Sequence, residues 1–137
     1  MKNSFILALI ALIIPFAACG QTVSGKAARK NLVVKEWNTD ASGHNKVLDH
    51  VTTYNADGFK VEEIEYGSSG QKWRKRFERG ANGKVSKESV YDEHNRLVSV
   101  KKIVYNELGK KKTQYTYNNK GKLVTVKTFE YLVEESD

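Results

Sequence analysis

The sequence has little of what stabilises many small exported domains. It contains one cysteine, Cys19, and one proline, Pro15, in 137 residues. A single cysteine excludes a disulfide within the chain. No stretch after the first 20 residues has a convincing helical period, which argues against a helical fold. The glycines are spaced along the chain rather than clustered, which argues against disorder.

The motifs that mark catalytic and metal sites are also missing. There is no HExxH, no cysteine pair, no glycine-rich phosphate loop before a helix and no nucleophile elbow. The histidines are scattered among turns and one strand: His44, His50 and His94. Glu62, Glu63 and Glu65 are close together, but Glu62 lies on the opposite strand face, and nothing identifies the cleft that a glycosidase pair requires. We expect no enzyme, no metal and no cofactor, with a hydrolase on a small barrel as the weakest alternative.

The first 20 residues have the layout of a signal peptide: Lys2, then an apolar run from Phe5 to Ala18 that is too short to span a bilayer comfortably. The stretch "FAAC" resembles a bacterial lipobox, although leucine is usual where Phe16 stands. That resemblance implies lipidation at Cys19; the alternative is ordinary cleavage after Gly20. We predict an exported protein, lipid-anchored to the outer membrane or cell surface, or otherwise periplasmic or secreted.

The formal charge is +7, with a sequence pI near 9.4. In a cytoplasmic protein this charge would indicate nucleic acid, but export makes a nucleic-acid partner unexpected. The counter-charges in the cell envelope are anionic lipid headgroups, lipopolysaccharide phosphates and acidic glycans. The alternative is that the charge serves solubility alone.

After residue 31 the chain is divided by four-residue segments that open with Asn, Asp or Gly and close with Gly or Asn: 40–43, 55–58, 67–70, 80–83, 92–95, 106–109 and 118–121. This pattern is typical of a type I turn followed by a residue with positive φ. Between the segments lie runs rich in Val, Ile, Thr and Tyr, which predict β-strands. "RLVSVKKIVY" (96–105) and "KLVTVKTFEY" (122–131) repeat 26 residues apart, so the unit is a pair of strands.

We therefore predict an all-β fold: an antiparallel meander of about eight strands, built from two-strand repeats and forming a curled sheet or a small barrel. Residues 1–20 are the signal peptide, 21–30 a flexible stalk, 31–133 the single β-repeat domain and 134–137 an acidic tail.

A tyrosine precedes the turn in most of these strands, and two interpretations of these tyrosines are open. They lie at positions 54, 66, 91, 105 and 117. At equivalent places in neighbouring strands, such rings form cross-strand contacts that define register. The alternative is an aromatic platform for sugars or bases. Because the position repeats with the turn, we favour the structural role.

The stretch "YTYNNKGKL" (115–123) resembles the YD repeat of RHS-type bacterial surface and toxin-shell proteins, and "SVYDEHNRL" (89–97) is a close variant. The resemblance covers roughly residues 50–131. It implies an exported, strip-like β-sheet that is associated with carbohydrate. Shell function does not transfer, because shells require dozens of repeats. The layout also resembles small exported lipoproteins of Bacteroides-like bacteria, and this carries no activity.

The strand "QKWRKRFER" (71–79) holds the candidate binding residues: Lys72, Trp73, Arg74, Arg76 and Phe77. Alternation places the three cations on one face and the two aromatics on the other. Three cations along a strand match repeating anionic groups, or they are a solvated face that resists aggregation. Farther along, alternation gives a second apolar face with Val98, Val100 and Val104.

Two functions follow from these features. The first is a non-catalytic envelope binding or structural module that contacts an anionic glycan or lipopolysaccharide through the strand at 72–79. The second is a protein-interaction partner, such as an immunity protein or assembly accessory, that binds an envelope protein through an apolar sheet face or an edge strand.

Overall fold

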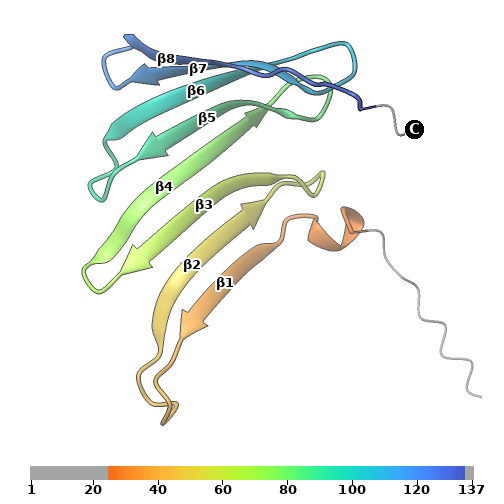
Figure 1. Cartoon of the computed structure of the whole chain (residues 1–137). Coiled ribbons are helices and arrows are strands. Elements are labelled where there is room, and N and C mark those ends of the chain that lie inside the picture. The colour runs from red at the N-terminus through yellow and green to blue at the C-terminus, as the bar shows by residue number, and fades with distance from the viewer. Residues whose placement is uncertain (1–24, 135–137) are drawn as a thin grey trace, which may run out of the picture.

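The computed structural model describes residues 25–134 and forms one eight-stranded antiparallel sheet, in which every strand pairs with its neighbours along the chain (Figure 1). The strands are β1 Val33–Asn38, β2 Val47–Tyr54, β3 Lys60–Gly67, β4 Gly70–Arg79, β5 Val85–Tyr91, β6 Leu97–Tyr105, β7 Lys111–Asn118 and β8 Leu123–Thr128. The predicted all-β meander of about eight strands is confirmed. The sheet is curled and open, so the predicted small barrel does not form, and β1 and β8 are its two edge strands.

The turns follow the chemistry of the repeated four-residue segments. The Asn106 side-chain oxygen accepts the backbone N–H groups of Leu108 and Lys110 at 3.0 and 2.9 Å. Gly109 then closes the turn with φ of 71° and donates its N–H to the carbonyl of Asn106. The fourth residue of each segment has positive φ, and in the segment at 92–95 this residue is Asn95. Glycine and asparagine tolerate this region best, so the sequence fixes where each hairpin reverses.

Each of the seven strand pairs contains one register shift, close to the turn that joins the two strands. In the β6–β7 pair, for example, Val104 pairs with Thr113 and Tyr105 with Lys111, which leaves Lys112 without a register partner. Such bulges increase the local twist of the strand. A bulge in every pair therefore accounts for a sheet that curls strongly instead of lying flat.

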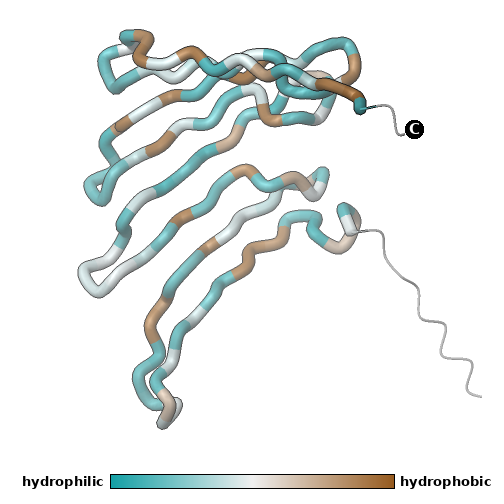
Figure 2. Tube along the Cα trace, in the orientation of Figure 1, coloured by the Kyte–Doolittle hydropathy of each residue, from teal (hydrophilic) through white to brown (hydrophobic). Residues whose placement is uncertain are grey.

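The sheet is a single layer without a hydrophobic core. Among residues 25–134 no hydrophobic side chain is buried, and Ser89 on β5 is the only buried polar side chain, at 7% exposure. Apolar positions recur on every strand, interleaved with polar ones (Figure 2). Strand pairing and contacts between side chains of neighbouring strands must therefore supply the stability that a core provides in other domains.

The N-terminal segment packs against the β2–β3 turn. Within it, the single 3-10 turn η1 (Ala27–Arg29) places the Arg29 guanidinium 5.5 Å from the Tyr54 ring centre, and the Lys26 ammonium lies 4.4 Å from the Phe59 ring centre. The backbone N–H of Asn31 donates to the carbonyl of Asn55. Within the stalk predicted at 21–30, Lys26 and Arg29 thus contact rings at the β2–β3 turn, although residues 25–30 are all exposed. The signal peptide, Cys19 and residues 135–137 lie outside the described residues.

Candidate functional site

The predicted binding strand is β4, in the middle of the sheet. Arg76 pairs with Glu62 and Arg74 with Ile64, and between them Lys75 pairs with Glu63. Lys72 is the bulged residue of the β3–β4 pair. Lys72 and Arg76 are exposed, whereas Trp73, Arg74 and Phe77 are half-buried.

Acidic and aromatic neighbours on the adjacent strands engage the cations of β4. The Lys72 ammonium lies 3.1 Å from a Glu65 oxygen, and its hydrogen bond is the largest cause that lowers the pKa of Glu65. Arg76 lies 3.7 Å from Glu62. These pairs are exposed and therefore individually weak, so an anionic ligand can exchange with the carboxylates.

Arg74 is held differently. Its guanidinium lies 4.6 Å from the centre of the Tyr91 ring on β5, and its Nε is buried without a hydrogen-bond partner in the described part of the chain. Arg74 is therefore set more deeply in the sheet than the exposed Lys72 and Arg76.

The aromatic residues of β4 are covered by cations. The Lys75 ammonium lies 4.4 Å from a Trp73 ring centre, and Lys60 lies 5.1 Å from the Phe77 ring centre. The His50 ring meets Trp73 edge-on, at 5.7 Å between ring centres. A sugar that stacked on Trp73 would first have to displace Lys75. The structure therefore brings the five predicted residues onto one strand but divides them between two faces and several partners.

A three-residue cluster that the sequence did not single out lies beside Trp73. Glu63 sits 3.0 Å from His50 Nε2 and 3.3 Å from the Lys60 ammonium. Burial opposes ionisation of this carboxyl, but the charge of Lys60 and the hydrogen bond from His50 outweigh burial and lower the pKa of Glu63. His50 and Glu63 are adjacent only through the β2–β3 register, which spacing along the chain does not specify. In this cluster the Glu63 carboxylate is paired with the Lys60 ammonium and with the His50 ring.

The second gathering of ionisable groups, Asp92, Glu93 and His94, is explained by turn formation. The Asp92 carboxylate accepts the backbone N–H groups of His94 and Arg96, each at 2.9 Å, and the bond from Arg96 is the largest cause that lowers the pKa of Asp92. Its oxygens thus close the β5–β6 hairpin. Neither cluster gives a reason to revise the expectation of a non-catalytic protein, which stays a prediction.

Tyr105, which precedes a turn, and Tyr131, its equivalent one repeat later, make the same kind of hydrogen bond through their hydroxyl groups. Tyr105 donates its hydroxyl to the carbonyl of Val85 at 2.7 Å, and Tyr131 donates to the carbonyl of Lys111 at 2.7 Å. Lys84 and Lys110 lie against these two rings, at 5.6 and 5.0 Å from the centres. These contacts accord with the structural role that we favoured for the tyrosines.

The apolar surface is largest toward β8. All six residues of β8 are exposed, and Val124 and Val126 are 63% and 50% exposed. Of the valines predicted on the apolar face of β6, Val98 and Val104 are exposed, while Val100 pairs with Tyr117 and is half-buried. β8 is bonded only to β7, so its other side presents backbone groups without a strand partner in the described chain.

No protein-family model, curated protein or solved structure matches this chain. The resemblance to YD repeats and to lipoproteins therefore stays a prediction. Among the described residues, no helix has the length and apolar character needed to cross a membrane.

Proposed function

We propose that the protein is a non-catalytic interaction module of the cell envelope, exported and lipid-anchored through Cys19, which binds an extended segment of a partner protein along β8. The observation that carries this proposal is β8 itself: an edge strand whose six residues are all exposed. Addition of a strand to an open sheet edge uses main-chain hydrogen bonds for affinity and alternate side chains for specificity.

Comparison of β8 with β6, one repeat earlier, indicates what the partner strand contacts. On β6, Val100 has Ser89 of β5 on one side and Tyr117 of β7 on the other. On β8, Val126 has Tyr115 of β7 on one side and no strand neighbour on the other among residues 25–134. A partner strand that placed an apolar or aromatic side chain beside Val126 would give it the second neighbour that Val100 already has in Tyr117.

Charge indicates the rest of the partner's chemistry. Residues 102–134 contain seven lysines and three glutamates, and the described chain has no ion pair beyond Lys101 in this region. Lys122 and Lys127 flank the exposed valines of β8. The segment that fits is extended, apolar on one face, and carries acidic residues near its ends.

The test uses two lysine substitutions on the same sheet face. Val126→Lys places a charge on the edge strand, and Val104→Lys places the same charge on the interior strand β6, at a site 44% exposed. Lysine on an edge strand opposes strand addition. Each purified variant is used to capture partners from detergent-solubilised envelope, and amide hydrogen exchange is compared before and after capture.

We expect a defined protein that the wild type and Val104→Lys retain and Val126→Lys loses, with slower exchange confined to β8 and its neighbours. Equal loss in both variants, or protection away from β8, would contradict strand addition at this edge.

An anionic glycan or lipopolysaccharide bound through β4 is the second candidate. It is favoured by the exposed, exchangeable ion pairs of Lys72 and Arg76. It predicts salt-sensitive glycan binding that falls in Lys72→Ala/Arg76→Ala but persists in Lys120→Ala/Lys122→Ala, which removes the same charge from the β7–β8 turn. If both double variants lose binding equally, net charge and not β4 is responsible.

A further inference from the structure

The strand connections lie at the two opposite ends of the strands, and one of these ends is much more basic. We call this side the basic turn row. It consists of the connections and terminal segments at this end, each taken with two residues of every adjoining strand: 25–34, 53–61, 78–86, 104–112 and 127–134. It contains ten lysine or arginine residues and five acidic residues. The opposite turn row, defined in the same way, has four basic and three acidic residues: 37–48, 66–71, 90–98 and 117–124.

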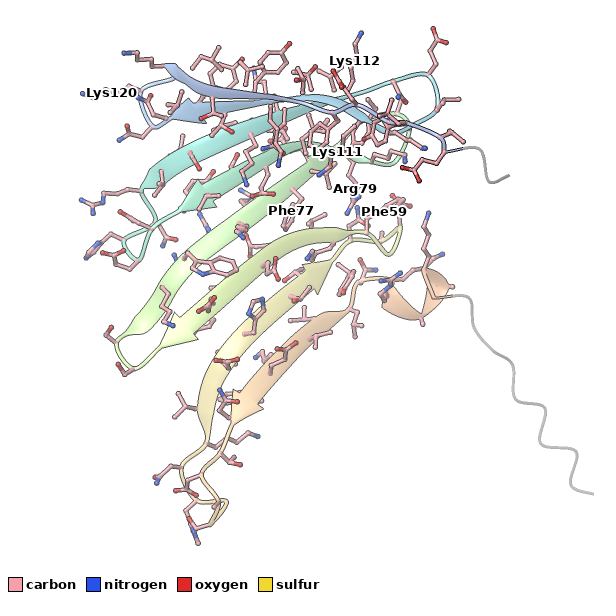
Figure 3. The ribbon with its side chains drawn as sticks, viewed as in Figure 1. Phe59, Phe77, Arg79, Lys111, Lys112 and Lys120 are labelled. Atoms are coloured by element: carbon pink, nitrogen blue, oxygen red, sulfur yellow. The ribbon has the colours of Figure 1, made fainter. Side chains whose placement is uncertain are left out.

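Cations and rings alternate along the basic turn row. The Phe59 ring lies between Lys26 and Arg79, at 4.4 and 4.7 Å, and the Phe129 ring lies between Lys111 and Lys127, at 5.9 and 5.4 Å. Figure 3 shows Phe59 and Arg79 on this side of the sheet, with Lys111 farther along it and Lys120 on the opposite side. A ring holds a lysine stem in place without neutralising its charge, so the exposed Lys26, Lys111 and Lys127 remain available to an anion, whereas Arg79 donates to the carbonyls of Lys60 and Gly83.

Exposed apolar side chains lie in the last two segments of the same row, 104–112 and 127–134. Leu108, at the tip of the β6–β7 turn, is 81% exposed, and Leu132 and Val133 are 90% and 89% exposed. Lysines beside exposed leucines and tyrosines form the pattern of a surface that lies on a charged membrane: cations attract the headgroups and the apolar tips enter the interface.

The chain enters the sheet at this same side. η1 packs on the β2–β3 turn, and six positions separate Cys19 from Gly25, the first described residue. A segment of that length reaches about 20 Å when extended. If Cys19 carries a lipid, as proposed above, the basic turn row is the side that faces the bilayer. The charge of the row itself does not depend on lipidation.

We propose that the basic turn row docks on an anionic phospholipid membrane and sets the orientation of the sheet. The strands then run away from the bilayer, and the open edge of β8 stays accessible to its partner. The occupant is the lipid surface, recognised through phosphate groups by the row of cations and through the apolar interface by Leu108.

The test is vesicle co-sedimentation of residues 21–137, a segment that includes every residue of the sheet and of η1 and lacks the lipid. One set of vesicles is phosphatidylcholine alone, and the other has one part phosphatidylglycerol to two parts phosphatidylcholine. Lys110→Gln/Lys112→Gln removes two exposed cations from the basic turn row, and Lys120→Gln/Lys122→Gln removes two exposed cations from the opposite row.

We expect binding to the anionic vesicles alone, weakened by salt because the screening length shortens to about 8 Å at physiological ionic strength. The Lys110/Lys112 variant should bind at least about tenfold more weakly, since each surface lysine contributes about a fivefold factor. The Lys120/Lys122 variant should bind like the wild type, and Leu108→Ser should weaken binding without altering its dependence on salt.

Three results would overturn the proposal: no binding of the wild type to anionic vesicles, equal weakening by the two lysine pairs, or complete competition by inorganic phosphate, which would identify a phosphate site instead of a membrane surface. The Val126→Lys variant separates this proposal from the partner site, because it should keep vesicle binding while losing the partner.

Discussion

Arg79 and Phe59 form the pair that Tyr105 and Lys84 form one repeat later, with the cation and the ring exchanged. Arg79 and Tyr105 each end a strand, and each donates to the carbonyl of the first residue of the preceding strand: Lys60 at 3.1 Å and Val85 at 2.7 Å. Phe59 and Lys84 each directly precede that first residue and lie against Arg79 and Tyr105. The contact, and not the residue type, is what repeats.

This equivalence predicts that the pair can be converted. Phe59→Lys alone places two cations together and should lower the free energy of unfolding by about 1 kcal/mol, and Arg79→Tyr alone removes the cation from the Phe59 ring. The double variant recreates the Lys84–Tyr105 arrangement, so its loss should be smaller than the sum of the single losses by about 1 kcal/mol. Urea unfolding of the four proteins measures this coupling, and strictly additive losses would contradict the equivalence.

The terminal hydrogen bonds should contribute measurably to a sheet without a core. Tyr105→Phe and Tyr131→Phe each remove one hydroxyl donor, and each should lower the free energy of unfolding by about 1 kcal/mol. Tyr117→Phe is the control, because its hydroxyl makes no hydrogen bond within the described residues. Chemical denaturation compares the three, and an equal effect in Tyr117→Phe would show that loss of a hydroxyl, and not loss of these hydrogen bonds, is responsible.

Gly58 allows the N-terminal segment to approach the β2–β3 turn. A Cβ at this position would lie 2.1 Å from the carbonyl oxygen of Lys26, and φ is 76°. Gly121 has the same φ but nothing within 4 Å, so Gly121→Ala should cost only the backbone strain, about 1–2 kcal/mol. Gly58→Ala should cost more and release η1.

Limited trypsin digestion measures that release, because Lys26, Arg29 and Lys30 all lie in this segment. Cleavage there should accelerate in Gly58→Ala and stay slow in Gly121→Ala. Similar cleavage in both variants would mean that the segment does not depend on the turn.

Stability should fall in acid, and Glu63 should account for part of the loss. The pKa of Glu63 is lower in the folded protein than its ordinary value of 4.5. Its contribution is therefore complete above pH 4.5 and is lost as the pH falls through the folded pKa. Glu63→Gln should reduce stability at neutral pH and flatten the acid limb of the stability profile. An unchanged acid limb in thermal unfolding between pH 3 and 7 would contradict this assignment.

The sequence predicted the strands and turns well because both depend on local chemistry: Asn106 and Gly109 make their turn with their own side chain and backbone. The bulges within the strands were not predicted, since Lys112 shows no sequence signal that distinguishes it from a paired residue. Whether the sheet closes depends on the accumulated twist of seven pairs, and hence on those bulges. The partners of Arg74 and Arg76 depend on register, so the sequence placed these residues on one face without showing that Tyr91 and Glu62 meet them.

The central claim is that the open edge at β8 binds a partner strand. The most direct measurement places a photo-crosslinking amino acid at Val126 or at Val104 in the native cell envelope. We predict one discrete crosslinked protein from position 126 and none from position 104, although both side chains are similarly exposed. No product at position 126, or the same products at both positions, would contradict the claim.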